Sequence, residues 1–155
     1  MSVEKVRDYL KQFNKGNDIL EMDESTATVE LAALALDTEE ARIAKSLSFY
    51  DGDGAMVIVT AGDAKIDNRK FKDYFGFKAR MLAPEDTEKF TGHAIGGVCP
   101  FALPENVKVY LDESMKRFET MFPACGTGNS AIELTLEELE QTSQSNTWID
   151  VCKNW

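Results

Sequence analysis

The sequence predicts a mixed α/β fold in which residues 1–155 form a single domain. A chain of 155 residues is long enough for one domain of ordinary size and too short for two. Hydrophobic residues make up 43% of the chain and charged residues 28%, which is typical of a globular protein rather than a disordered one. Short stretches with the period of a strand alternate with short helical stretches, at spacings too irregular for a doubly wound parallel sheet.

Two helices are predicted in the first forty residues. Apolar residues at helical spacing mark the first: Val3, Val6, Leu10 and Phe13. Gly16 suits the position just past its end, and residues 19–22 suggest a short strand. Thr28 can cap the second helix. The buried stripe of that helix contains Val29, Ala32, Ala33 and Leu36. Asp37 with Glu40 has the spacing of a variant capping box for one more helical turn.

The hydrophobic pattern changes from helical to alternating at residue 43. Ile43, Leu47 and Phe49 share one face of a strand over residues 43–50, and Lys45 lies on that same apolar face. The Asp-Gly-Asp-Gly run at 51–54 predicts a turn. It does not predict a calcium site, because it lacks the later ligands of a calcium loop. Residues 55–60 are again apolar, so the two strands should form a hairpin.

Capping residues, glycines and prolines predict where the later elements begin and end. Asp67 can begin a helix that ends before Gly76, and residues 77–82 suggest a strand. Pro84 suits the first position of a short helix through residue 90, followed by a loop over 91–104. Residues 107–111 alternate as a strand. Thr135 and Glu138 form a capping box for a helix, and residues 148–152 predict a closing strand.

Composition narrows the classes of function. The chain has 27 acidic and 17 basic residues, a formal charge of −10, which argues against a protein that coats DNA. No apolar stretch approaches the ~20 residues of a membrane helix, and the N-terminus lacks the core of a signal peptide. Three widely separated cysteines favour a reducing cytoplasm over a disulfide framework. With one histidine and no Cys-x-x-Cys pair, we expect no metal site.

Lys45 is the first candidate for chemistry. Lysine rarely faces a core unless its charge has a partner or a role. It could snorkel from an edge strand, or it could project into a pocket and hold a phosphate, a carboxylate or a polarised carbonyl. Residue type and pattern leave both interpretations open.

Two small-residue loops are the next candidates. The loop over 91–101 contains adjacent glycines, whose backbone amides can approach a ligand and stabilise an oxyanion, although such a loop is often only a surface turn. The loop over 124–130 carries hydroxyl and amide side chains. Cys99 and Cys125 lie in these loops, but we expect no nucleophilic role for them. His93 is expected to be structural rather than a catalytic base.

A basic segment stands out against the acidic chain. Residues 65–80 carry six basic and two acidic side chains, a local charge of +4, so the rest of the chain carries −14. A solvated helix face explains most such segments, and a modest phosphate-binding patch is the sharper hypothesis.

Five short motifs occur in order along the chain. They are Ala27-Thr28-Val29-Glu30 with Ala32-Ala33, Ile43-Ala44-Lys45-Ser46-Leu47, Ala61-Gly62-Asp63, Thr91-Gly92 with Gly96-Gly97-Val98-Cys99-Pro100-Phe101, and Val109-Tyr110-Leu111-Asp112-Glu113-Ser114. Each motif alone is weak. In this order and spacing they resemble the YbaK/EbsC family of aminoacyl-tRNA deacylases, which are similar to the editing domain inserted in bacterial prolyl-tRNA synthetases. The resemblance covers residues 17–152.

The resemblance implies a compact domain with a mixed, partly barrel-like β-sheet surrounded by short helices. It implies trans-editing, the hydrolysis of the ester between a small wrong amino acid (Cys, Ala or Ser) and tRNA for proline. It implies no metal or organic cofactor. The implied partner is the acceptor end of aminoacyl-tRNA, with prolyl-tRNA synthetase as a candidate for delivering it, and neither DNA nor a membrane.

Lys45 matches the functionally essential lysine of that family, and Gly96, Gly97 and Val98 match the loop that contacts the aminoacyl end. The predicted substrate contacts lie in the same motifs and in the loop over 124–130: Thr28, Ser46, His93, Cys99, Pro100, Asp112, Gly126 and Asn129. Cys99 departs from the family, since relatives commonly have serine there.

A mechanism follows as a hypothesis. An aminoacyl ester is already activated, so the protein must mainly position it and stabilise the charge on its carbonyl oxygen. The amides of Gly97 and Val98 would face that oxygen, Lys45 would anchor a polar end of the substrate, and water or the thiol of a cysteinyl substrate would attack. Two alternatives use the same pocket: a module that binds aminoacyl-tRNA or a small ligand without turnover, and a hydrolase of small acyl esters or amides.

Overall fold

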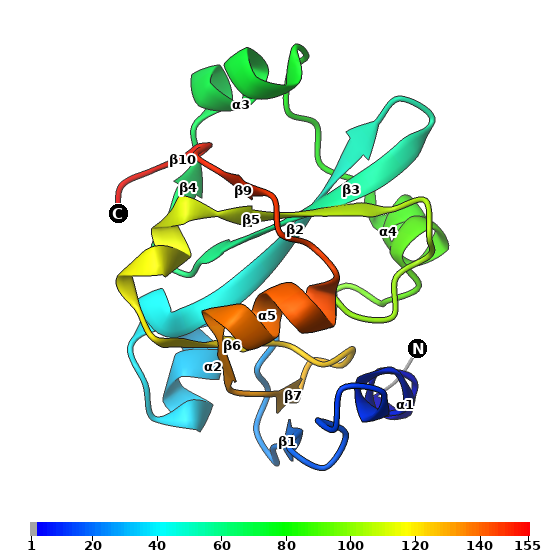
Figure 1. Ribbon diagram of the computed structural model, residues 1–155, viewed down its shortest axis with the longest axis vertical. Coiled ribbons are helices and arrows are strands. Elements are labelled where there is room, and N and C mark those ends of the chain that lie inside the picture. Colours follow the sequence, from blue (N-terminus) through cyan, green and yellow to red (C-terminus); the bar gives the residue numbers. More distant parts are fainter. Residues whose placement is uncertain (1–2) are drawn as a thin grey trace.

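The computed structural model describes residues 3–155 and is built around one curled mixed sheet (Figure 1). The sheet has six strands in the order β8-β6-β2-β3-β5-β9. Their bounds are β2 Ile43–Asp51, β3 Gly54–Ala61, β5 Lys108–Asp112, β6 Thr120–Pro123, β8 Leu134–Thr135 and β9 Trp148–Ile149. The hairpin β2–β3 is antiparallel, whereas β6 runs parallel to β2 and β5 parallel to β3. The predicted fold class is therefore confirmed.

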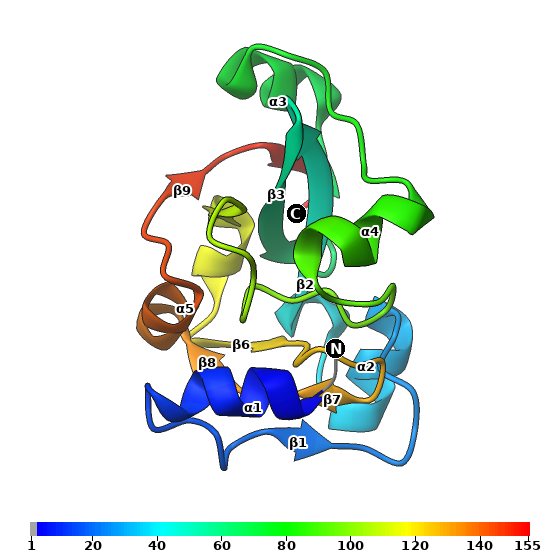
Figure 2. The same ribbon diagram turned by 90° about the vertical axis from the view of Figure 1, so that its right-hand side faces the viewer.

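Short helices and two small sheets surround this centre. Within residues 3–155 the helices are α1 Val3–Lys11, α2 Val29–Leu36, α3 Asn68–Phe75, α4 Pro84–Thr91 and α5 Leu136–Ser143, with 3₁₀ helices η1 Glu40–Arg42 and η2 Glu113–Arg117. The small sheets pair β1 Leu20–Glu21 with β7 Ser130–Ala131, and β4 Lys65–Ile66 with β10 Cys152–Lys153. In Figure 2, α4 and α5 lie on opposite sides of the central sheet, and α3 and α1 lie at opposite ends of the molecule.

The predicted caps explain where three helices begin. Thr28 Oγ1 accepts a hydrogen bond from Leu31 N at 3.2 Å at the start of α2. Asp67 caps α3, and Gly76 ends it with a φ of 84°. At α5, Thr135 and Glu138 form the reciprocal capping box. These local signals were sufficient because each helix end needs only its own polar partners.

The hydrophobic core has two parts. The larger one lies between the sheet and its covering helices and includes Val6, Leu10 and Phe71, all fully buried. The smaller one joins α2 to strands β2 and β6 through Ala32, Ala33, Ile43 and Phe122. The smaller cluster is important for function because it forms one wall of the cavity described below.

Several sequence predictions were wrong in detail. Residues 77–82 form no strand, only an isolated bridge between Met81 and Phe49. The closing strand over 148–152 is two strands, β9 and β10. Asp37 is the left-handed C-cap of α2, and the side chain of Glu39, the N-cap of η1, makes no cap hydrogen bond. Gly16 does not end the first helix, which stops at Lys11.

None of the helices within residues 3–155 combines the length and the apolarity that crossing a bilayer requires.

Candidate functional site

A cavity of about 420 Å³ lies between α2, β2, the start of α4 and the loops around residues 95–98 and 124–131. Its volume is in the range of small-molecule sites. Much of the wall is apolar and built from small, branched or aromatic side chains: Ala27, Val29, Ala32, Ile43, Phe122 and Ala131. Such a wall suits a small apolar group.

Lys45 on β2 is the one ionisable side chain that lines this cavity within residues 3–155. It is half-buried, and its ammonium donates to the carbonyl oxygens of Gly62, at 3.4 Å, and Ala64. Burial lowers the pKa of Lys45 below its usual value, an effect that the charge of Asp63 partly opposes. Two carbonyl acceptors leave a third N–H available, so the lysine can donate to a ligand while it stays anchored.

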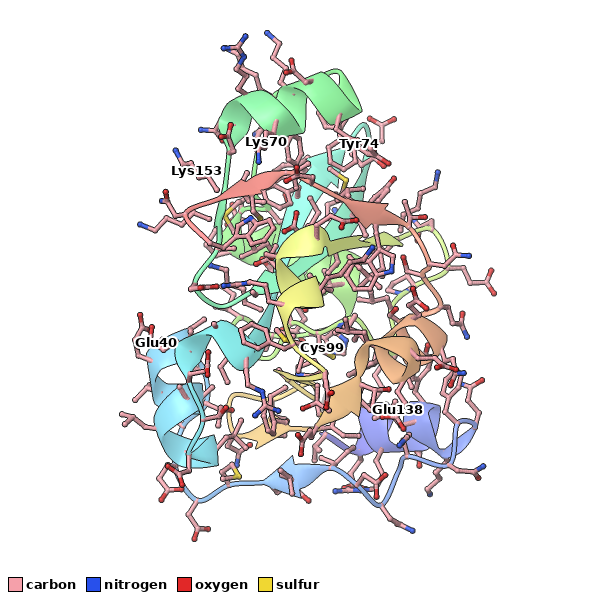
Figure 3. The ribbon with its side chains drawn as sticks, turned by 60° about the vertical axis from the view of Figure 1, so that its left-hand side comes forward. Glu40, Lys70, Tyr74, Cys99, Glu138 and Lys153 are labelled. Carbon is pink, nitrogen blue, oxygen red and sulfur yellow. The ribbon has the colours of Figure 1, made fainter. Side chains whose placement is uncertain are left out.

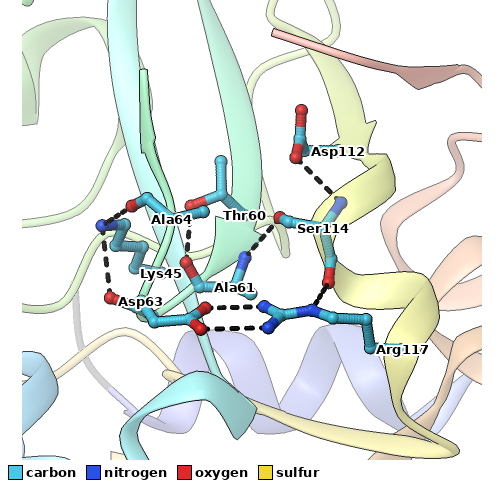
Figure 4. Close-up of polar contacts among 9 residues, drawn as sticks. Lys45, Thr60, Ala61, Asp63, Ala64, Asp112, Ser114 and Arg117 are labelled. Atoms are coloured by element: carbon cyan, nitrogen blue, oxygen red, sulfur yellow. Dashed lines mark hydrogen bonds and ion pairs between the residues drawn. The ribbon is translucent and has the colours of Figure 1, made fainter. Parts of the chain in front are cut away.

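The turn that anchors Lys45 is itself held by polar contacts (Figure 4). Ala64 N donates to Ala61 O at 3.1 Å and closes the turn. Asp63 forms a two-point ion pair with Arg117 of η2, at 2.6 and 3.0 Å. Gly62 packs so closely against η1 that an added Cβ would lie 2.1 Å from Glu40 O. The position of the turn is therefore fixed from several sides.

The glycine loop presents its amides unequally. Gly97 N donates to Ala94 O at 3.0 Å, which occupies the amide expected to face an oxyanion. Within residues 3–155, no acceptor satisfies the amides of Gly96 and Val98. Gly96 and Val98 also line the cavity, whereas Gly97 does not. The amides of Gly96 and Val98 are therefore better placed than that of Gly97 to donate to a ligand.

Gly97 lies where two loops touch. A Cβ at this position would lie 2.6 Å from both C and O of Gly126 and 2.8 Å from Thr127 N. Only glycine lets the loop over 91–101 approach the loop over 124–130 this closely. Gly97 and Gly126 thus shape the cavity rim through packing of the backbone.

Two buried hydroxyls on the cavity lining have no hydrogen-bond partner within residues 3–155. They are Thr26 Oγ1 and Ser46 Oγ. A buried polar group without a partner costs about 1–3 kcal/mol, so such groups are suited to bind a polar ligand. Ser46 was predicted from the sequence, but Thr26 was not, because it precedes the N-cap and carries no motif of its own.

The structure brings five of the predicted site residues together on the cavity lining, namely Thr28, Lys45, Ser46, Gly96 and Val98. The seven others lie outside it: His93, Gly97, Cys99, Pro100, Asp112, Gly126 and Asn129. Contact of these seven with substrate stays a prediction.

His93 and Cys99 are fully buried beside each other, with Cys99 Sγ 3.5 Å from His93 Nε2. His93 Nε2 also lies 2.7 Å from Phe101 O, and burial lowers the pKa of the imidazole. Burial raises the pKa of the Cys99 thiol to about 12, and Figure 3 shows Cys99 deep within the molecule. Both side chains therefore pack in the interior of the loop over 91–101.

Asp112 is fully buried and accepts hydrogen bonds from Ser114 N and Val151 N, so it joins β5 to η2 and the C-terminal segment. Pro100 lines a second, more polar cavity of about 490 Å³ on the side of α5. Asn129 is exposed and ties its loop to Met22 O at 3.2 Å.

The basic segment over 65–80 forms β4, α3 and the irregular stretch over 76–80 that leads to the cavity. Lys70 is paired with Asp150 at 3.1 Å, and Figure 3 shows Lys70 and Lys153 at the same end of the molecule. Arg69, Lys72 and Lys78 are exposed. Their contact with phosphates stays a prediction. No group of three or more metal-ligating side chains occurs within residues 3–155.

Comparison with known proteins identifies the family to which this chain belongs. The family model of the aminoacyl-tRNA editing domain matches residues 23–142, which include every element that contributes to the cavity. This chain belongs to the aminoacyl-tRNA editing domain family. The resemblance inferred from the five motifs is thereby confirmed.

The relatives of this editing domain differ in how far they match. The uncharacterized protein YwhH of Bacillus subtilis is 57% identical and covers 100% of this chain and 99% of its own. The Enterococcus faecalis protein named "Putative Cys-tRNA(Pro)/Cys-tRNA(Cys) deacylase EbsC" is 29% identical over 75% of this chain and 72% of its own. Proline–tRNA ligases match over a small part of their length, 15% for the Leuconostoc mesenteroides enzyme.

A solved structure agrees with the editing domain in fold. Its title reads "Crystal structure of a putative trans-editing enzyme for prolyl tRNA synthetase". It is 29% identical, covers 99% of each chain and superimposes with a TM-score of 0.88. The curled sheet and the surrounding helices are therefore the architecture of this family.

Proposed function

We propose that this editing domain is an aminoacyl-tRNA deacylase, which hydrolyses the ester of tRNA for proline charged with a small wrong amino acid. The observation that carries the proposal is the cavity, whose lining combines an apolar wall with Lys45, anchored through its ammonium, and with Gly96 and Val98, whose amides have no acceptor within residues 3–155. The family and its relatives support deacylation of mischarged tRNA. The choice of tRNA for proline rests on the names of EbsC and of the solved structure.

The chemistry requires little from protein side chains. A water oxygen adds to the ester carbonyl, and the electron pair of the carbonyl bond moves onto its oxygen. When the tetrahedral intermediate collapses, the bond to the ribose oxygen breaks, that oxygen takes a proton, and the amino acid leaves as a carboxylic acid. A cysteinyl substrate can supply its own thiol as nucleophile instead, forming a thiolactone that water later opens.

Val98 N–H is the proposed donor to the developing oxyanion, and the Lys45 ammonium the proposed cationic anchor. The residues that line the cavity within 3–155 include no Asp, Glu, His or Cys, so no such side chain there can act as base or nucleophile. Positioning and electrostatic stabilisation must then provide the acceleration, and both suit an activated ester. The free hydroxyls of Thr26 and Ser46 can bind the ribose or the α-amine.

The apolar wall formed by α2 and β2 is proposed to hold the amino acid side chain. Ala32 and Ile43 are nearly fully buried there, and Val29 packs beside them. Because these residues are packed against one another, a methylene added to or removed from this wall should change the room left for the substrate side chain. One methylene in such a pocket changes selectivity by about 1–3 kcal/mol.

Changes in this wall should alter selectivity in opposite directions. Val29→Ala should raise kcat/KM for 2-aminobutyryl-tRNA relative to alanyl-tRNA by about tenfold, since it makes room for one methylene. Ala32→Val should lower that ratio, because it narrows the same wall. Competition between the two charged tRNAs for proline in one reaction measures the ratio directly. An identical ratio in both variants would place the side chain elsewhere.

The pH dependence should report the charge of Lys45. Its pKa lies below the ordinary lysine value, so the ammonium loses its proton at a lower pH than an exposed lysine does. If the charged form is active, the rate corrected for spontaneous hydrolysis should fall as pH rises through that pKa. Lys45→Arg, which stays charged, should be slower but should lack this alkaline decline. A decline that persists in Lys45→Arg would assign it to another group.

Ester loss from defined substrates tests the proposal as a whole. The purified protein is incubated with tRNA for proline charged with alanine, cysteine or serine, and also with a small alanyl ester. Faster loss of the tRNA esters than in buffer supports a deacylase. Protection of the esters would instead show a module that binds without turnover. Hydrolysis of the small alanyl ester at the same rate as the tRNA esters would show an acyl hydrolase that does not recognise tRNA.

A further inference from the structure

The turn over residues 61–64 is fixed at both ends by η2 and the end of β5. Ala61 N donates to Ser114 Oγ at 3.1 Å, and Ser114 N in turn donates to the buried carboxylate of Asp112 at 2.9 Å (Figure 4). This end of the turn is buried and fully hydrogen-bonded. Such a network has little freedom to adjust.

Arg117 holds the other end of the turn. Its two terminal nitrogens donate to the two carboxylate oxygens of Asp63, and its Nε donates to Ser114 O at 2.9 Å. A planar guanidinium that makes three directed hydrogen bonds fixes orientation as well as distance. Arg117 therefore aligns the turn with η2, the same helix that holds Ala61.

The Arg117–Asp63 pair is too exposed to act mainly on stability. The side chains are 31% and 36% exposed, and an ion pair in such surroundings contributes little to stability. Its consequence for geometry is larger, because Asp63 lies between Gly62 and Ala64, whose carbonyl oxygens hold the Lys45 ammonium. While Arg117 occupies the Asp63 carboxylate, Lys45 bonds to neutral carbonyl groups.

We propose that Arg117 is a positioning residue for the reaction: it keeps the Asp63 carboxylate away from Lys45 and holds the turn so that the ammonium stays directed at the substrate. This inference rests on the proposed role of Lys45. Without Arg117, the freed carboxylate is a neighbouring anion that can pair with the ammonium. The charge would then be neutralised and drawn out of the cavity.

One single variant, one double variant and a control variant test the proposal through kinetics. Arg117→Gln should lower kcat for deacylation by roughly tenfold with KM within about twofold, since small misplacements in a site cost rate. Arg117→Gln combined with Asp63→Asn should regain part of that loss, because the competing carboxylate is gone. Arg7→Gln is the control: it removes the ion pair of Arg7 with Glu21, which joins α1 to β1 instead of holding the turn over 61–64, and it should match the wild type.

The partial recovery separates positioning from a structural role. A residue that only stabilises the fold would make the double variant equal to or worse than Arg117→Gln. Should Arg117→Gln not fold, Arg117→Lys retains the charge with fewer contacts and should lose activity by a smaller factor. A kcat in either folded variant equal to that of the wild type would overturn the proposal.

A second measurement does not depend on catalysis. NMR titration of the ¹³C-labelled lysine ε-methylene groups gives the pKa of Lys45, which can be assigned with Lys45→Arg. This pKa should rise in Arg117→Gln, because Asp63 becomes an uncompensated anion, fall in Asp63→Asn, and stay unchanged in Arg7→Gln. An unchanged pKa in Arg117→Gln would overturn the inference, whether or not the wild type proves to be a deacylase.

Discussion

Lys45→Ala is expected to lower kcat/KM for deacylation at least about 100-fold while the protein remains folded. Loss of one preorganised donor from a water-poor site costs about 10²–10³ in rate. Lys45 is the one ionisable group on the cavity lining within residues 3–155, so no other charged side chain there can take its place. Single-turnover deacylation measures this effect without a contribution from product release.

The melting temperature of Lys45→Ala should change little although its activity falls. Burial already disfavours the charged form of Lys45, so its removal should leave the melting temperature within a few degrees of the wild type. Lys11→Ala is the matched control, because Lys11 is an exposed lysine of α1 that pairs with Asp8 one turn earlier on the same helix. Full activity in a folded Lys45→Ala protein would remove the lysine from the mechanism.

Gly97→Ala is expected to abolish most activity by separating two loops. The new Cβ would lie 2.6 Å from backbone atoms of Gly126, and backbone cannot give way as a flexible side chain does. The loop over 91–101 must therefore shift, and Val98 N–H moves with it. We expect a loss of rate of about 100-fold and a loss of about 1–3 kcal/mol in the free energy of unfolding.

Gly54→Ala provides the control for this prediction. Gly54 lies at the start of β3, the nearest atom to an added Cβ is 3.8 Å away, and its φ does not require glycine. Denaturant unfolding and the deacylation assay, run on both variants, separate a general effect of alanine from the loop displacement. If Gly97→Ala retains wild-type kcat/KM, the position of the loop is unimportant for catalysis.

Local signals predicted the elements that depend on local interactions. The hairpin β2–β3 follows from alternating apolar residues around a turn, and the caps Thr28, Asp67 and Thr135 place their helices. The strand expected at 77–82 was wrong for a physical reason. Phe77 packs against Phe71 and Phe75 of α3, so the apolar pattern there reflects an aromatic cluster. Two-residue strands such as β7 carry no period to detect.

The sequence predicted the part of the site that lies on a single strand better than the part that lies in loops. Lys45 and Ser46 of β2 both line the cavity. Adjacent amides of the glycine loop differ, since Gly97 N–H donates to Ala94 O, whereas Val98 N–H has no acceptor within residues 3–155. Asp112 lies in a matching motif and is nevertheless buried two hydrogen bonds from the turn that anchors Lys45. Arg117 carried no sequence signal, because its partner Asp63 is 54 residues away.

The most direct test is a crystal structure with a non-hydrolysable analogue, adenosine bearing a 3′-alanylamino group in amide linkage. The proposed mechanism predicts that the amide oxygen accepts from Val98 N–H, that Lys45 contacts the same ligand, and that its methyl group faces Ala32. A ligand bound in the second cavity beside Pro100, or one whose carbonyl points away from both Val98 and Lys45, would contradict it.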